Sequence, residues 1–255
     1  MERPYERRTS ARTAVVWEAV QSLLEGASGA HGSDGADGAG ALRVLDVGGG
    51  TGGFAVRVAG LGHRVTVVDP SPDALAALGR RAAEQDVADR VTGLQGDLAD
   101  LGDLAPEGGL DVVLCHGVLG LVDDPVAALR TIASVLRPGG SLSLLVGQRH
   151  AAVLARAMAG HFSQASALLH GESGTESARA VERRFAAEEV TGLLEEAGFA
   201  VAGIQGVRVF TDLVPSSLLD LEPGASSALL ELERAVSTRP EYLTLASQLH
   251  VLATR

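Results

Sequence analysis

The chain lacks the features of a disulfide scaffold, a cysteine metal cluster or a membrane protein. Its one cysteine, Cys115, lies in the apolar run 111–120, so it has no second thiol with which to form a disulfide or ligate a metal. No apolar stretch approaches the roughly 20 residues that a transmembrane helix needs. The charged first ten residues are not followed by the apolar region of a signal peptide. We therefore expect a soluble, cytoplasmic protein with a reduced core cysteine.

Basic and aromatic residues are also scarce. The 255 residues include 21 Lys and Arg against 32 Asp and Glu, a net charge of −11, and aromatics make up 3%. Such an acidic balance argues against general nucleic-acid binding, although a local basic face stays open. The 46% of hydrophobic residues indicates a globular chain that is long enough for a full core. One α/β domain with additions is the simplest expectation.

From residue 40 onward, short Val- and Leu-rich runs alternate with helical stretches, which is typical of a parallel sheet covered by helices. Two helices are predicted to begin at a capping residue followed by proline, at Ser71 and at Asp124. Further helices are predicted at 52–62, 188–199 and 225–236. Strands are predicted at 41–47, 63–69, 111–117, 141–147, 200–210 and 243–255.

Two polar tracts divide the chain. Residues 31–40 are almost entirely Gly, Ala and Asp, which predicts a flexible linker after an N-terminal helix. Residues 1–41 then form an N-terminal helix and linker, and residues 42–255 form the main domain. The polar stretch 170–184 predicts a mobile loop within the wider segment 161–185.

The stretch LDVGGGTGGF, residues 45–54, fits two cofactor motifs. Gly48, Gly50 and Gly53 match the G-x-G-x-x-G of a dinucleotide site, whereas Gly48, Gly50 and Gly52 match the G-x-G-x-G of an S-adenosylmethionine (SAM) site. Asp46 is unfavourable beside a pyrophosphate and suits the ammonium group of SAM. Asp69, about 20 residues beyond the glycines, is placed to bind a ribose. Both cofactors contain a ribose, so Asp69 does not decide between them.

Three stretches in order, VLDVGGGTGGFAVRVAGLGHRVTVVDPSPDAL, LQGDLADL and DVVLCHGVLGLVDDPVAALRTIASVLRPGGSLSL, resemble the motifs of class I SAM-dependent methyltransferases over residues 42–147. The resemblance implies an α/β, Rossmann-like seven-stranded sheet of order 3-2-1-4-5-7-6, with helices on both faces, an N-terminal helix and C-terminal additions. It also implies the cofactor SAM. The residues implied to bind it in this part of the chain are Asp46, Gly48, Gly49, Gly50, Asp69, Asp97, Leu98 and His116.

Further stretches, among them AAVLARAMAGHF, GVRVFTDL and RPEYLTLASQLHVLA, resemble the bacterial tRNA 5-carboxymethoxyuridine methyltransferases. That family methylates the carboxylate of a modified wobble uridine. The resemblance implies that Arg12 pairs with the SAM carboxylate. An ionised carboxylate attacks the sulfonium methyl in line, so we expect no catalytic acid or base and no metal. Gln148, His150 and Arg208 are the candidates that orient the acceptor.

The acceptor itself stays open. Only Arg179, Arg183 and Arg184 offset the acids of the loop 170–184, which is a weak signal for an RNA backbone. The tRNA anticodon loop and a small-molecule carboxylic acid or natural product are therefore both retained as acceptors. A SAM-binding protein without transferase activity and a dinucleotide-dependent oxidoreductase share the glycine turn and are separated by binding and turnover assays. No membrane partner is expected.

Overall fold

A computed structural model describes residues 4–30, 40–104, 107–170, 183–219 and 224–255, without the side chains of 4–12, 30 and 216. Its strands are β1 Arg43–Val47, β2 Arg64–Asp69, β3 Val91–Gln95, β4 Leu110–His116, β5 Leu136–Gly147, β6 Ala200–Val207 and β7 Gln248–Thr254. Its α-helices are α1 Pro4–Ala30, α2 Ala55–Gly60, α3 Pro72–Glu84, α4 Leu101–Leu104, α5 Pro125–Val135, α6 Arg149–Met158, α7 Phe162–His170, α8 Ala187–Glu196, α9 Ser216–Leu219, α10 Ala225–Ser237 and α11 Pro240–Leu243. Two 3₁₀ turns are η1 Leu98–Asp100 and η2 Leu119–Leu121.

The strands form one seven-stranded sheet of order β3-β2-β1-β4-β5-β7-β6, which confirms the expected order. β1 pairs in parallel with β2 and β4, and β2 pairs in parallel with β3. The end of β7 meets the start of β5, since Gly139 N–H donates to Arg255 O and Arg255 N–H to Gly140 O, both at 2.9 Å. β7 therefore runs antiparallel to β5.

Two compact units make up the chain, and each gathers separate segments. The first holds Met1–Glu18, Leu145–Thr191 and Ile204–His250, and the second holds Ala19–Leu144, Gly192–Gly203 and Val251–Arg255. We call them the hairpin unit and the sheet unit. The expected division near residue 41 stays a prediction, because residues 31–39 are outside the described part.

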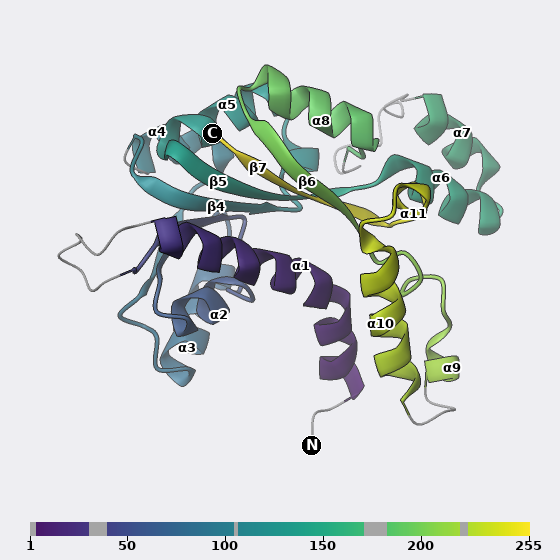
Figure 1. Cartoon of the computed structure of the whole chain (residues 1–255), viewed down its shortest axis with the longest axis horizontal. Helices are drawn as coiled ribbons and strands as arrows, with labels where there is room; N and C mark the ends of the chain where they lie inside the picture. Colours follow the sequence, from purple (N-terminus) through teal and green to yellow (C-terminus); the bar gives the residue numbers. More distant parts are fainter. Residues whose placement is uncertain (1–3, 31–39, 105–106, 171–182, 220–223) are drawn as a thin grey trace. The chain divides into compact units, whose positions relative to one another are not determined.

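The sheet unit is built on buried apolar strands. All but the last residue of β4 are buried, and so are four of the five residues of β1, as expected of strands that are covered on both faces. Figure 1 shows α2 and α3 on one side of these strands and α4 and α5 on the other. The expected α/β sheet with helices on both faces is therefore confirmed.

Local sequence signals fixed where two helices begin. Ser71 Oγ accepts the N–H of Ala74 at 3.2 Å at the start of α3. Asp124 Oδ1 accepts the N–H of Ala127 at 3.0 Å at the start of α5. Each cap is followed by proline, as the sequence predicted.

Several expected boundaries were wrong. The strand expected at 243–255 begins only at Gln248, because Pro240–Leu243 form α11, and the strand expected at 200–210 ends at Val207. The helix predicted at 52–62 is shorter and begins at Ala55. Gly52 has a φ of +78°, which is not helical, so the chain up to Phe54 belongs to the turn. β5 begins at Leu136 and not at 141, because Gly139 and Gly140 pair with Arg255. The φ of Gly139, +74°, lets the strand continue through Pro138.

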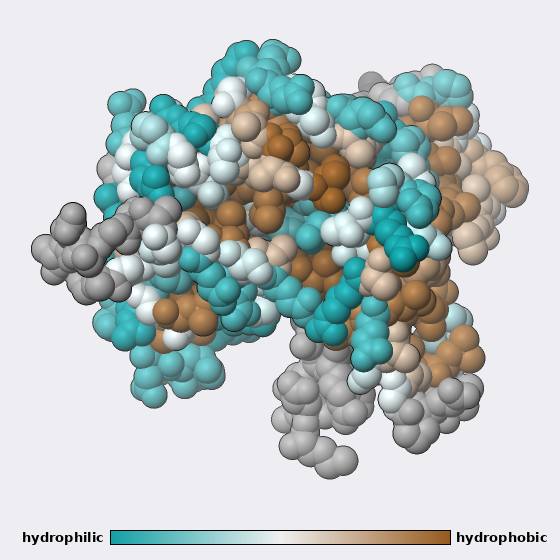
Figure 2. Space-filling model, in the orientation of Figure 1, coloured by the Kyte–Doolittle hydropathy of each residue, from teal (hydrophilic) through white to brown (hydrophobic). Residues whose placement is uncertain are grey.

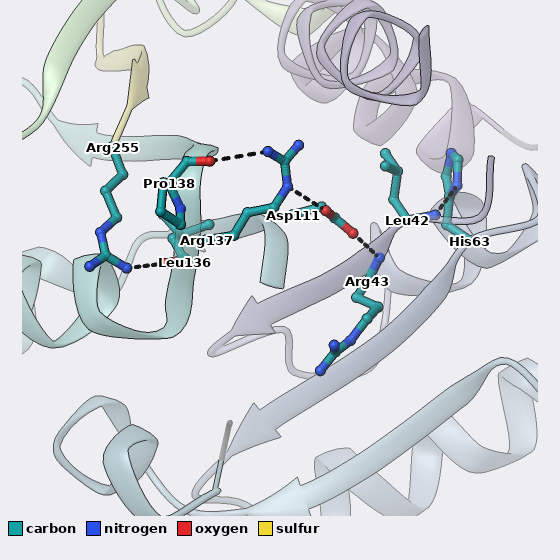
Figure 3. Close-up of polar contacts among 8 residues, drawn as sticks. All are labelled: Leu42, Arg43, His63, Asp111, Leu136, Arg137, Pro138 and Arg255. Carbon is teal, nitrogen blue, oxygen red and sulfur yellow. Dashed lines mark hydrogen bonds and ion pairs between the residues drawn. The ribbon is translucent and has the colours of Figure 1, made fainter. Parts of the chain in front are cut away.

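A polar cluster joins the amino ends of the sheet-unit strands (Figure 3). Asp111 accepts the N–H of Arg43 at 2.8 Å with one carboxylate oxygen and Nε of Arg137 at 2.7 Å with the other. His63 Nδ1 accepts the N–H of Leu42 at 3.2 Å. Because both oxygens of the buried Asp111 are used, the cluster fixes the register of β1, β4 and β5 at the edge opposite the glycine turn. In the part of the chain that the structure describes, no helix has the length and apolar composition needed to cross a membrane.

Candidate active site

The glycine turn after β1 distinguishes the two cofactor motifs. Gly48, Gly50 and Gly52 have φ angles of +66°, +55° and +78°. A Cβ at Gly52 would lie 2.2 Å from Cδ1 of Leu78, whereas a Cβ at Gly53 would meet nothing closer than 3.9 Å. The turn therefore requires glycine at the three positions of the SAM motif and not at the third position of the dinucleotide motif.

Asp46 lies beneath this turn. Its side chain is buried, and a Cβ at Gly49 would come within 2.6 Å of its Oδ2. Burial, and then the nearby charge of Asp69, raise the pKa of Asp46 to about 7. Gly49 is thus needed because the acid is packed against the backbone of the turn.

Asp69 connects the end of β2 to the same turn. Its Oδ2 accepts the N–H of Gly50 and its Oδ1 accepts the N–H of Ser71, both at 2.9 Å. These bonds hold the carboxylate in one orientation, with lone pairs left for further donors.

A pocket of about 770 Å³ opens beside these residues, within the sheet unit. Gly48, Asp69, Asp97, Leu98 and His116 all line it, so the structure brings together five of the predicted cofactor residues. Asp97 caps η1 by accepting the N–H of Ala99 at 2.7 Å, and Leu98 is buried behind it. Asp46, Gly49 and Gly50 support the turn and do not line the pocket.

His116 is held at the end of β4. Its Nε2 lies 2.9 Å from Oγ of Ser143, and its ring meets the ring of Phe54 edge-on with centroids 4.9 Å apart. Among the described residues, no three His, Cys, Asp or Glu side chains are grouped so that they could hold a metal ion.

The apolar wall of the pocket was missed by the sequence reasoning. It comes from η2 and the start of α5, including Val118, Leu121, Val122 and Ala128. Leu121 is 66% exposed, which is unusual for a leucine beside a buried strand. The apolar run that continues beyond His116 was the available signal, and we interpreted it only as strand and loop. Asp124, interpreted as a helix cap, is confirmed as one.

The candidate acceptor residues lie in the hairpin unit. Gln148 follows β5 and Arg208 follows β6, and both connect to Ser247 just before β7. The N–H of Gln148 donates to Ser247 O at 3.0 Å, and the N–H of Ser247 donates to Arg208 O at 3.3 Å. Gln148 and Arg208 are thus brought together at one edge of the sheet. His150 is an exposed residue in the first turn of α6.

Arg208 has an unusual environment. Its φ is +60°, its Nη2 pairs with Asp212 at 2.5 Å, and its Nη1 lies 3.5 Å from Oε1 of Gln248. Its Nε is buried and has no hydrogen-bond partner among the described residues. A partly buried guanidinium on a strained backbone, with one N–H donor unpaired, is typical of a ligand-binding residue and unusual for a surface charge. Arg12 lies in α1, but its side chain is outside the described part.

The sheet order and the glycine turn are those of SAM-dependent methyltransferases, and the comparisons agree. A methyltransferase domain model matches residues 44–140. A solved SAM-dependent methyltransferase from Mesorhizobium loti is 20% identical, with a TM-score of 0.56 over 94% of this chain and 97% of that chain. The protein is a SAM-dependent methyltransferase.

Two relatives of known activity indicate the family within the SAM-dependent methyltransferases. The tRNA 5-carboxymethoxyuridine methyltransferase of Escherichia coli (strain K12) is 34% identical over 214 residues, which cover 84% of this chain and 80% of that protein. A ubiquinone biosynthesis O-methyltransferase of Xanthomonas campestris pv. campestris (strain B100) is 37% identical over 120 residues, 46% of this chain and 48% of that protein. The chain belongs to the family of the tRNA 5-carboxymethoxyuridine methyltransferase.

Proposed function

We propose that the protein transfers the methyl group of SAM to the carboxylate of 5-carboxymethoxyuridine at the wobble position of tRNA. The support is the relative with this printed activity, which matches far beyond the cofactor half of the chain. The observation that supports an acceptor site is that Gln148 and Arg208 are both hydrogen-bonded through their backbones to Ser247, just before β7. A small carboxylic acid is the other acceptor considered, and the experiment below separates the two.

The sheet-unit pocket fits SAM by its chemistry. Asp69 is oriented by two backbone donors and offers lone pairs to the ribose hydroxyls. Asp97 and Leu98 border the adenine, and His116 stands beside the cofactor at the end of β4. Gly48 borders the methionine part, and Asp46, Gly49 and Gly50 act on it by supporting the turn. Arg12 is the proposed partner of the methionine carboxylate.

The acceptor carboxylate is bound by Arg208. Guanidinium N–H groups in a planar fork match the two oxygens of a carboxylate and fix its direction. Asp212 pairs with Nη2 and Gln248 lies near Nη1, which limits the rotation of the guanidinium. Nε is buried and is the guanidinium nitrogen without a partner among the described residues. Gln148 and His150 are the other two residues proposed to orient the acceptor.

Methyl transfer from SAM to a carboxylate requires the protein mainly to position the two reactants. SAM supplies an electrophilic methyl group on a sulfonium, and the acceptor carboxylate is already ionised at neutral pH. The side chains therefore orient the acceptor oxygen and exclude water, and none of them is needed as a general base. The proposed substrate also places the protein in the cytoplasm.

Labelled SAM tests the proposal against its alternative. The purified protein is given tRNA from a strain that lacks the corresponding gene, free 5-carboxymethoxyuridine, and a panel of small carboxylic acids. We expect label on the tRNA, with a kcat/KM at least about 100-fold above that for the free nucleoside, since the rest of the RNA contributes binding energy. Label on a small acid with unlabelled tRNA would assign the protein to small-molecule methylation. Binding of SAM without any turnover would reject both.

A further inference from the structure

The helical hairpin α6–α7 is free of acidic residues in a chain that is acidic as a whole. Residues 149–170 include Arg149, His150, Arg156, His161 and His170 but no Asp or Glu, whereas the whole chain carries a net charge of −11. A net charge of this sign repels a polyanion from the chain as a whole. This hairpin is a region where a polyanion can approach without that repulsion.

The same hairpin exposes large apolar side chains. Met158 is 72% exposed, Phe162 71% and Leu169 58%, and no residue of α6 is buried. Figure 2 shows brown, hydrophobic atoms over the position of α6 and α7 in Figure 1. Phe162 is the one aromatic side chain classed as exposed in the described part of the chain. Exposed apolar side chains gathered in this way mark a contact surface.

The turn between the helices places the basic and aromatic groups together. The N–H of His161 donates to Arg156 O at 2.9 Å, and the N–H of Ala165 donates to His161 O at 3.0 Å. Gly160 adopts φ +77° between them. Arg156, His161 and Phe162 are therefore carried on one tight turn, and all three are exposed.

The other end of the hairpin is anchored beside the candidate acceptor residues. The side chain of Gln148 caps α6 by accepting the N–H of His150, and its Nε2 donates to Leu243 O at 3.1 Å. Arg149 is only partly exposed and pairs with Glu189 at the start of α8, whereas Arg156 is exposed. Arg156 is therefore the arginine of the hairpin that is placed to meet an external anion.

We propose that α6–α7 is an RNA-docking surface, on which Arg156 and His161 contact phosphates and Phe162 stacks on an unpaired base of the anticodon loop. Single-stranded loops offer both groups at once, because their bases are splayed out and their phosphates flank them. An anionic membrane or a second copy of the acidic chain would also match the charge. The combination of exposed basic side chains with an aromatic ring on one tight turn favours RNA, and the other two partners are outcomes of the test below. The inference rests on the proposed function and adds where the RNA binds.

Two exposed variants and a matched control test the surface. Phe162→Ala and Arg156→Gln are compared with Arg80→Gln, which removes another exposed arginine, on α3. The readouts are binding of an anticodon stem-loop at several salt concentrations, KM for tRNA, SAM affinity, and the melting temperature. We expect Phe162→Ala to raise KM roughly tenfold. Arg156→Gln should lower the salt slope by about one, and Arg80→Gln should change neither quantity.

The outcomes separate this inference from the proposed function. If the unaltered protein methylates tRNA and both hairpin variants keep its KM and salt slope, the docking surface is wrong and the proposed function stands. If the unaltered protein neither binds the stem-loop nor methylates tRNA, both are wrong. Binding to phosphatidylglycerol vesicles, or self-association, that is lost in Phe162→Ala while stem-loop binding persists would also overturn the RNA assignment.

Discussion

Glu233 Oε1 accepts both the backbone N–H and the side-chain hydroxyl of Thr211, each at 2.7 Å. The same buried carboxylate accepts the N–H of Phe210 at 2.8 Å and that of Val209 at 2.9 Å. One side chain of α10 therefore satisfies the three backbone donors that directly follow Arg208. Glu233 is thereby a positioning residue for the proposed acceptor site.

The first prediction concerns this carboxylate. Glu233→Ala leaves buried donors unsatisfied and should lower the free energy of unfolding by about 1–3 kcal/mol. Glu233→Gln keeps one acceptor oxygen and should recover part of the loss. KM for tRNA should rise in both variants while SAM affinity stays the same, a split that a general loss of folding would not produce. Glu231→Gln, an exposed neighbour on α10, is the control for urea unfolding and for KM.

A second prediction separates two adjacent glycines. Gly52→Ala forces a Cβ toward Leu78 at a φ of +78°, so it should lower the free energy of unfolding by more than about 1 kcal/mol and weaken SAM binding. Gly53→Ala meets open space and should change stability by less than about 0.5 kcal/mol. Thermal unfolding and calorimetric SAM titration measure both. Equal effects of the two substitutions would contradict the assignment of the turn to the SAM motif.

The third prediction is a pH dependence. Burial and the charge of Asp69 raise the pKa of Asp46 to about 7, so the folded protein without SAM holds a proton that the unfolded chain releases. The contribution of the protonated Asp46 to the stability of the folded protein is fully present below the ordinary pKa of 3.8. It is lost as the pH rises through about 7. The ammonium group of SAM favours the ionised acid, so SAM affinity should increase over the same interval.

Asp46→Asn is the matching variant. It removes the titrating group and should flatten the pH dependence of SAM affinity, measured by calorimetry in buffers of different ionisation enthalpy. Release of protons on SAM binding near pH 7 should also disappear. An unchanged pH profile in the variant would place the titration elsewhere.

The fourth prediction concerns Arg208. Arg208→Ala should spare SAM affinity and lower turnover with tRNA by about 100-fold, because the acceptor carboxylate loses its orienting partner. Arg208→Lys retains the charge but not the planar fork, so it should recover only part of the activity. Arg239→Ala, an exposed arginine of the same unit, is the control. Normal turnover in Arg208→Ala would exclude it from the acceptor site.

The cofactor half of the fold was predictable from the sequence because its signals are local. The apolar runs, the two caps with their prolines, and the glycines of one turn each depend on residues close together in the chain. Placement of Asp46, Asp69, Asp97 and His116 at neighbouring strand ends followed from the known strand order, and the pocket lined by the last three is found there.

The acceptor half was less predictable because its contacts are long-range. Nothing near Arg208 in the sequence indicates that Glu233 and Ser247 hold its segment, since these residues come from a later helix and from the turn before β7. The early start of β5 likewise depends on Arg255, more than a hundred residues away. No sequence signal indicated where Met158 and Phe162 lie, and only the folded chain shows them exposed on α6 and α7.

The most direct test of the central claim is tandem mass spectrometry of digested tRNA after reaction with SAM carrying a deuterated methyl group. The account predicts the label on 5-carboxymethoxyuridine as a methyl ester, which mild alkali removes. Label that resists alkali, on a base atom or a ribose oxygen, would contradict it, and so would unlabelled tRNA in the presence of tightly bound SAM.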